Sequence, residues 1–372
     1  MRRMTRLPAA LLACLVMLLG WASPAHAVGN AEAARKSASY LASQSATVTE
    51  VGLAADVLLG LLATGDASMT TQTSALTSTV KGGAQAYAAK GPEAAAKLAI
   101  LASALGEDPR NFAGLDLVGS VKAGLRPDGS FGSVPGAGAS ALGMIALARA
   151  NEQVPTSMLR YVVRLAGSDG GFGSAPAASA DAESTAWALL ALGTQTDSIS
   201  ARAALLTGAA WASTQQHADG SWRGGSTIRT TALMASALQA AGLAQPRAIS
   251  YLASQQLADG SLAEQGKGDL TATAVGALAL ADTSYAGVSS APTNATSGPS
   301  TTASPGAIVT AAPEPAPNPM RPLVGDSWLW ILQPVVLLGL LAATGYYLFI
   351  RPTRKKKPKP DAVPDPPTTN TP

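Results

Sequence analysis

Four short turns of one pattern recur along the chain, and their spacing constrains the fold more than any other feature. Each reads Asp-Gly, then a small residue, then an aromatic residue or leucine: Asp128–Phe131, Asp169–Phe172, Asp219–Trp222 and Asp259–Leu262. Their first residues lie 41, 50 and 40 positions apart, a period that indicates a repeat architecture. Asp-Gly favours a tight turn, and we expect the large apolar residue after it to plug the space between neighbouring helices.

Helical stretches flank these turns on both sides. The sequence predicts helices before the turns at 158–165, 201–215 and 248–255, and Ala- and Leu-rich helices after them at 140–150, 183–192, 229–241 and 270–281. The first half repeats the plan without the Asp-Gly turn, since Tyr40–Gln44 matches Tyr251–Gln255 residue for residue, and 51–62 and 93–105 are again Ala- and Leu-rich. The total is six helix pairs.

The two helices of each pair differ in composition. The second is apolar around most of its circumference and rich in small residues, which is typical of a buried helix. The first carries Arg, Lys, Gln and Ser on one face and is therefore expected to be half exposed. Six buried and six half-exposed helices in alternation favour an all-α double ring. An open solenoid is the alternative, and it would need polar caps that the sequence does not show.

The residues around the third turn resemble a known repeat. Trp211–Gln216, followed by Asp219–Trp222, is similar to the Gln-Trp repeat of the squalene and terpene cyclases and of the prenyltransferase β-subunits. Weaker copies lie at 161–172 and 251–262, and the resemblance covers about residues 31–282. It implies an (α/α)6 toroid of six helix-hairpin repeats, and it says little about chemistry.

Enzymes of these families need residues that this sequence lacks. The zinc-dependent prenyltransferases use Asp, Cys and His, whereas residues 28–283 hold no Cys and a single His, His217. The thioester-forming toroids need a Cys too. No Asp-Asp-x-x-Asp run is present for magnesium, and the nearest match to the Asp-x-Asp-Asp acid motif is Asp181–Ser184. We therefore expect no catalytic residue, no metal and no cofactor.

The remaining relatives that the resemblance suggests are the cobalamin carriers. Their inner helices begin with an acidic residue, then Thr, then an Ala-rich stretch, and these polar groups face the ligand. Asp181–Ala186 and Asp269–Ala274 look similar, and Ser226–Ala232 is a variant with a basic residue. The resemblance thus implies a ligand site at the mouth of the ring made by Glu50, Asp56, Asp181, Glu183, Thr185, Trp187, Thr227, Arg229, Asp269, Thr271 and Thr273. The carriers also have a β-rich domain, which is missing here.

Several of these residues also have a purely structural interpretation. Asp181 and Asp269 stand where helix N-caps are expected, which is compatible with ligand contact. Trp187 fits a core position as well as a stacking platform, and Trp222 fits the repeat plug. Asp56 interrupts an apolar stretch, so it must face a cavity or be paired, and Arg229 is a candidate partner.

The ends of the chain predict export and membrane anchoring. Residues 1–27 have the charged start, apolar run and Ala-x-Ala site of a signal peptide. Residues 284–327 are rich in Pro, Ser and Thr, as in a disordered linker, and 328–350 form an uncharged apolar stretch long enough to span a bilayer. The basic and then Pro-rich tail, 351–372, is expected in the cytoplasm. This predicts a single-pass, type I protein of the cell membrane with residues 28–283 as an extracytoplasmic domain.

Net charge restricts the kinds of partner that are expected, and cysteine content decides whether disulfides can form. The chain carries a net charge of +3, but residues outside the signal and the tail hold 17 basic and 21 acidic side chains. The exported part is therefore acidic, and nucleic acid is not expected as a partner. With no Cys after residue 27, disulfides are excluded as well.

These patterns predict a non-enzymatic protein that binds a small amphiphilic ligand or a second envelope protein at the mouth of the ring. A cobalamin-like or other large amphiphilic molecule is what the resemblance implies. One alternative is an enzyme of the terpene cyclase and prenyltransferase class, or a carbohydrate-active toroid using two of Asp56, Asp181, Glu183 and Asp269. The other is a structural cell-surface scaffold, which predicts no deep open cavity.

Overall fold

The computed structural model describes residues 25–290, and within them the chain is mostly helical. This confirms the all-α expectation. The first helices of the pairs are α2 (Ala25–Gln44), α4 (Thr70–Ala88), α6 (Leu117–Ala123), α8 (Thr156–Val163), α10 (Ile199–Gln215) and α12 (Pro246–Ser254). The second helices are α3 (Val51–Leu62), α5 (Pro92–Ala104), α7 (Ala137–Arg149), α9 (Ala182–Gly193), α11 (Thr227–Ala240) and α13 (Leu270–Leu280).

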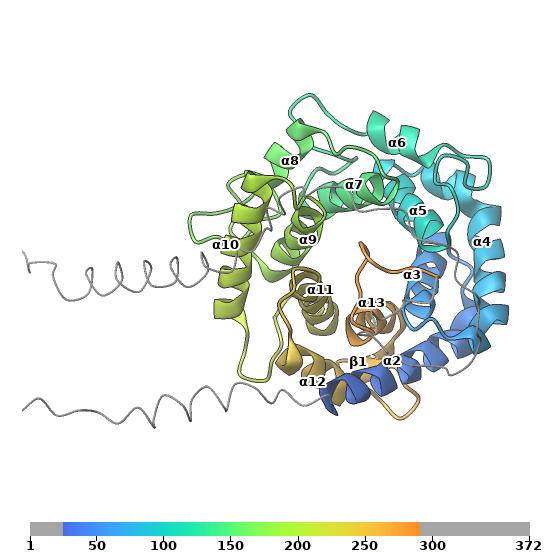
Figure 1. Ribbon diagram of the computed structural model, residues 1–372. Helices are drawn as coiled ribbons and strands as arrows, with labels where there is room; N and C mark the ends of the chain where they lie inside the picture. Colours follow the sequence, from blue (N-terminus) through green and yellow to red (C-terminus); the bar gives the residue numbers. More distant parts are fainter. Residues whose placement is uncertain (1–24, 291–372) are drawn as a thin grey trace, which may run out of the picture. The chain divides into compact units, whose positions relative to one another are not determined.

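The second helices contact one another in a closed cycle. Helix α3 contacts α5, α5 contacts α7, and the series continues through α9, α11 and α13 back to α3. Figure 1 shows these six helices around a centre, with α2, α4, α6, α8, α10 and α12 outside them. We call the two sets the inner and outer helices. The inner helices are mostly buried, as their apolar, Ala-rich composition predicts.

In all four Asp-Gly turns the Asp Oδ1 accepts a hydrogen bond from the backbone N–H two residues later. In three of them the Asp Oδ1 accepts from the backbone N–H and the hydroxyl of the serine two residues later, as for Asp219 with Ser221 at 3.0 and 2.7 Å. Asp169 accepts instead from the Gly171 N–H and, through Oδ2, from the Trp211 indole. The glycine that follows each Asp has a φ between 87° and 93°, a conformation that disfavours other residues.

Each turn packs its glycine on the next outer helix. A Cβ on Gly129 would collide with the Ser157 carbonyl of α8, and the turns at Gly170 and Gly220 meet α10 and α12 in the same way. The last turn packs its glycine on α2, the first outer helix of the described part, because a Cβ on Gly260 would collide with the Lys36 carbonyl. The same junction includes the bond from the Ser37 hydroxyl to the Gly260 carbonyl, across 223 positions of sequence.

A column of threonines fixes the turns from the inner side. The hydroxyls of Thr185, Thr231 and Thr273 accept from the backbone N–H of the large residue of the turn before them, at 2.9, 3.0 and 2.8 Å. The side chains of those residues, Phe172, Trp222 and Leu262, are fully buried. Trp222 is therefore the plug that the sequence predicts.

One strand pair departs from the all-helical expectation. Between the last turn and α13, β1 (Leu262–Glu264) pairs antiparallel with β2 (Lys267–Asp269). Two short 3-10 helices, Ser45–Thr47 and Ala67–Met69, complete the regular elements of the described part.

The predictions at both ends of the chain fall largely outside the described residues. These are the signal peptide up to residue 24, the linker from residue 291 onwards, the membrane-spanning stretch at 328–350 and the tail at 351–372. Within residues 25–290, no helix combines the length and the apolar character that crossing a membrane requires.

Candidate functional site

The acidic residues at the starts of the inner helices act as helix caps. Carboxylates of Glu50, Asp181 and Asp269 accept from the backbone N–H groups of Leu53, Ser184 and Ala272. The prediction that Asp181 and Asp269 are N-caps is therefore confirmed. We call this end of the inner helices the N-terminal mouth, defined by the caps Glu50, Asp181, Ser226 and Asp269.

The threonines expected at the ligand site fall into two groups. Thr185 and Thr273 are buried, and their hydroxyls hold the turns at Phe172 and Leu262, so these two hydroxyls are committed to the repeat fold. Thr227 and Thr271 lie in the first turns of α11 and α13 and are half-buried. Only the second pair remains accessible at the N-terminal mouth.

Two ion pairs join neighbouring inner helices near this mouth. Lys97 on α5 donates to Asp56 on α3 at 2.8 Å, and Arg229 on α11 donates to Glu183 on α9 at 3.2 Å. The expectation that Arg229 pairs with Asp56 is wrong, because α11 packs against α9 and α13 rather than against α3. Each charge pairs instead with the opposite charge on an adjacent helix.

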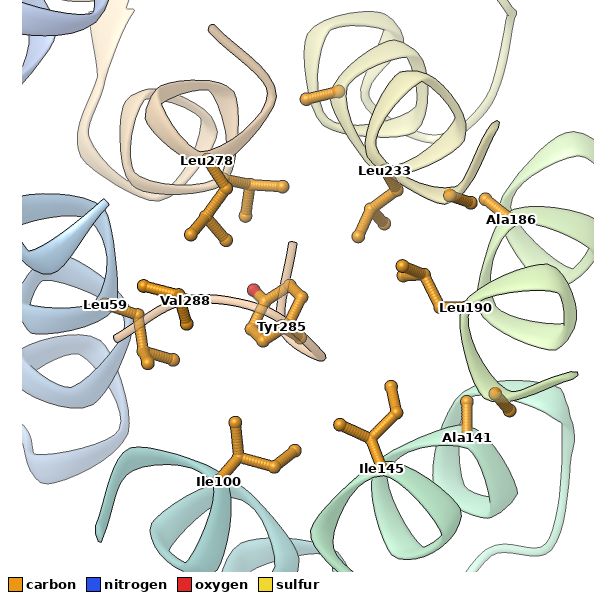
Figure 2. Close-up of a cluster of buried hydrophobic side chains, with 14 of the residues drawn as sticks. Leu59, Ile100, Ala141, Ile145, Ala186, Leu190, Leu233, Leu278, Tyr285 and Val288 are labelled. Carbon is orange, nitrogen blue, oxygen red and sulfur yellow. The ribbon is translucent and has the colours of Figure 1, made fainter. Parts of the chain in front are cut away.

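Helix periodicity places these four charges on the inner faces of their helices. Each lies three or four positions before a side chain that points to the centre in Figure 2, and such positions share one face. The pairs of charged and central residues are Asp56 with Leu59, Lys97 with Ile100, Glu183 with Ala186, and Arg229 with Leu233. The charges therefore form a layer between the apolar centre and the N-terminal mouth.

The centre of the ring is filled by the chain itself. Tyr285 and Val288 are 5% and 1% exposed, and Figure 2 shows them among inward-pointing side chains of α3, α5, α7, α9, α11 and α13. The centroid of the Tyr285 ring lies 5.3 Å from that of the half-buried Trp187 ring, so Trp187 contacts the segment that fills the centre. Burial raises the pKa of the Tyr285 hydroxyl well above its ordinary value. The charge of Asp56 raises this pKa further, and that of Arg229 opposes it.

The segment that carries Tyr285 is held at the other end of the inner helices. Arg149, the last residue of α7, donates to the carbonyls of Tyr285, Ala286 and Val288. The Ser290 N–H donates to the Ala104 carbonyl at the end of α5. Residues 284–290 were expected to begin the linker, but they pack against the ring, and the folded part extends to Ser290.

Four residues of this arrangement were not singled out from the sequence. Lys97 stands in an Ala-rich helix three positions before Ile100, and a lone charge at a core-facing position is a signal for a partner. Tyr285 and Val288 are spaced by three in a segment of Ser, Ala and Gly, which is a weak anchoring signal. Arg149 is the last residue of α7, and a basic residue at a helix end carries no sequence signal for a partner 136 positions later.

Among residues 25–290, no group of three or more His, Cys, Asp or Glu side chains lies close enough together to hold a metal ion. Comparison with protein-family models gave no match, and no curated protein matches this chain.

Proposed function

We propose that this protein is a membrane-anchored, extracytoplasmic (α/α)6 toroid of the prenyltransferase and squalene cyclase repeat type. In this proposal it is a non-catalytic scaffold that binds a second envelope protein at the N-terminal mouth. The closed cycle of inner-helix contacts and the outer helices around it support the toroid. The Gln-Trp-like repeat supports the family, and the patterns at both chain ends support the location.

The observation that carries the proposal is the filled centre. Tyr285 and Val288 occupy the space in which a toroid would enclose a large amphiphilic molecule, whether a corrinoid or a terpenoid. Such a ligand would have to displace both side chains and the backbone that Arg149 holds. Recognition on the rim needs no such displacement, and this favours a protein partner.

The carboxylates at the mouth support a non-catalytic role. Asp181 and Asp269 are occupied as helix caps, and Asp56 and Glu183 are occupied in ion pairs. A pair of carboxylates for glycoside hydrolysis would need one free acid and one free base on the two sides of the bond. All four inner-helix candidates for that task hold structural partners instead.

One loop at the N-terminal mouth has the features of a contact surface. Val134, just before α7, is 81% exposed, the largest value among the exposed large apolar residues. The loop is held in place because the Ser133 and Val134 N–H groups both donate to Glu93 at the start of α5. A loop whose backbone is already held in place loses little conformational entropy on binding, which favours contact between the exposed Val134 side chain and a partner.

Site-specific photo-crosslinking in the cells that make the protein tests the proposal. A photoreactive residue at Val134 should give one crosslinked envelope protein, and Val134→Asp should reduce co-purification of that protein. The matched control is the same photoreactive residue at Ser78, which is exposed on the outer helix α4 and should give no such product. Equal crosslinking at both positions, or a corrinoid retained by the purified protein, would contradict the proposal.

A further inference from the structure

Helix α10 is longer than its place in the ring requires. The turns that flank it, at Asp169 and Asp219, are 50 positions apart, whereas the other neighbouring turns are 41 and 40 apart. Most of the extra length is helix, because α10 has 17 residues while α8 and α12, the outer helices before and after it, have 8 and 9. Figure 1 shows α10 outside α9, at the periphery of the ring. Since α8 and α12 cover their inner helices with about half this length, covering the ring does not explain the additional turns of α10.

The outward face of α10 is apolar. Ile199 and Leu206 are 79% and 66% exposed, and Ala203 and Ala210 are exposed as well. Separations of 4, 3 and 4 positions place these four residues on one face of the helix. We call them the α10 stripe. The opposite face packs on the ring through the buried residues Ala201, Ala204, Gly208, Ala209, Trp211 and Ala212. An outer helix that met only water would carry polar residues on its outward face instead.

The lack of charge around the stripe restricts what can cover it. Arg202 is the only charged residue of α10, and the other exposed side chains beside the stripe are Ser and Thr. A helix that lies on a membrane surface usually has several Lys or Arg residues on its polar face, and often a Trp or Phe on its apolar face. The single aromatic residue of α10, Trp211, is buried against the ring. An uncharged face of this kind fits a second uncharged helix better than a lipid surface.

The order of large and small residues makes the stripe complementary to itself. Large and small side chains alternate along it, as Ile199, Ala203, Leu206 and Ala210. When two such helices pack antiparallel, Ile199 of one copy faces Ala210 of the other, and Leu206 faces Ala203, so each large side chain meets a small one in all four layers. Parallel packing would place large against large and leave gaps at the alanines. A two-fold axis generates the antiparallel arrangement, in which both copies use the same surface.

The size of the stripe predicts a weak contact. A helix of 17 residues is about 25 Å long and about 10 Å wide, so the contact covers on the order of 300 Å² of each copy. Stable complexes bury about 800 Å² per partner. The contact is therefore expected to form and dissociate readily, with a dissociation constant between micromolar and millimolar.

We propose that two copies of this protein associate through an antiparallel contact between their α10 stripes. The surface is separate from the N-terminal mouth and does not depend on the partner proposed there. Each copy would keep its own mouth, so the dimer would present two mouths to partners.

Disulfide crosslinking of the full-length protein in the membranes of the cells that make it tests the register. The chain has no Cys after residue 27, so introduced thiols are the only ones of the exported part. A copy with Ile199→Cys and a differently tagged copy with Ala210→Cys, made together, should form a mixed disulfide dimer. Two copies of the same variant should not crosslink, because the antiparallel register separates identical positions by 11 residues, about 16 Å along the helix. Ser78→Cys, at an exposed position of α4, is the matched control and should give no dimer.

A charge in the stripe tests its energetic role. Leu206→Lys should raise the dissociation constant of the dimer at least tenfold, measured by sedimentation velocity of the full-length protein in detergent. The melting temperature should stay the same, because the Leu206 side chain is largely exposed in a single copy. Leu257→Lys makes the same change at an exposed leucine outside α10 and should leave the dissociation constant unchanged.

Four results would each overturn the proposal. They are a full-length protein that stays monomeric at millimolar concentration, crosslinking that is stronger between identical positions than between residues 199 and 210, an unchanged dissociation constant for Leu206→Lys, and crosslinking of the stripe to a different protein in place of a second copy.

Discussion

The threonine column makes a quantitative prediction about what holds the repeats together. Replacing Thr185, Thr231 or Thr273 by Val keeps the shape of the side chain but removes the acceptor for a buried backbone N–H. An unsatisfied buried donor costs roughly 1–3 kcal/mol, so each variant should lose about 2 kcal/mol of unfolding free energy. For a domain of this size that lowers the melting temperature by roughly 5 °C.

The three losses should add, because the three hydroxyls lie on different helices and share no partner. The triple variant would then lose about 6 kcal/mol, a large part of the 5–15 kcal/mol that holds a typical domain together. Urea denaturation of the full-length protein, followed by circular dichroism at the helix band, measures each loss. Thr71→Val, at an exposed position of α4, is the control and should change stability by less than about 0.5 kcal/mol.

The refuting result is equally specific. If the three Val variants unfold within about 0.5 kcal/mol of the Thr71→Val control, hydroxyl acceptors do not hold the turns. The apolar plugs alone would then fix each turn, and the shared threonine geometry would have no energetic role.

Three further predictions concern ring closure, the buried ion pair and the filled centre. Gly260→Ala should cost about 1–3 kcal/mol in a denaturation experiment because of its φ of 89° and its contact with α2, while Gly225→Ala, in open space, should be nearly neutral. Lys97→Met should cost about 3 kcal/mol by leaving Asp56 buried and unpaired, and a further Asp56→Leu change should recover most of that. Burial is the largest single influence on Lys97 and would lower its pKa, but the charge and hydrogen bond of Asp56, together with the charges of Tyr87 and Glu50, outweigh it, so the pKa is raised. The pair's stabilisation should therefore be complete below about pH 10 and be lost as pH rises through the raised pKa. Tyr285→Ala should cost about 3–5 kcal/mol through the cavity it leaves, and a melting temperature equal to that of the unmutated protein would exclude a packing role for Tyr285.

The local features were predictable because they depend on short-range sequence. Asp-Gly turns, caps such as Asp181 and the Ala-rich inner helices each follow from residues a few positions apart. The two ion pairs depend on which helices are neighbours in space, and this is why Arg229 was assigned to Asp56 instead of Glu183. Ring order would have excluded that pairing, since α11 and α3 are separated by α13.

The filled centre was not predictable from composition. Residues 284–290 resemble a linker in their Ser, Ala and Gly content, and only Tyr285 and Val288 supply large apolar side chains. Their burial depends on a space that the six inner helices create together and on the long-range anchor at Arg149, 136 positions before Tyr285. Neither the central space nor the contact with Arg149 can be inferred from the residues next to Tyr285 in sequence.

Closure of the ring has a consequence for the order in which the chain can fold. Of the helices in residues 25–290, α2 is synthesised first, yet its partners on α12, on α13 and in the turn at Gly260 are made more than 200 positions later. The part of α2 that packs on α12 and α13 must stay uncovered until those helices are made, while the repeats between them stack. Contacts this distant in sequence slow folding and leave surfaces open to misassociation. The earliest helix of the described part is therefore the last to gain all its contacts, and the growing chain needs protection there until the final repeat is made.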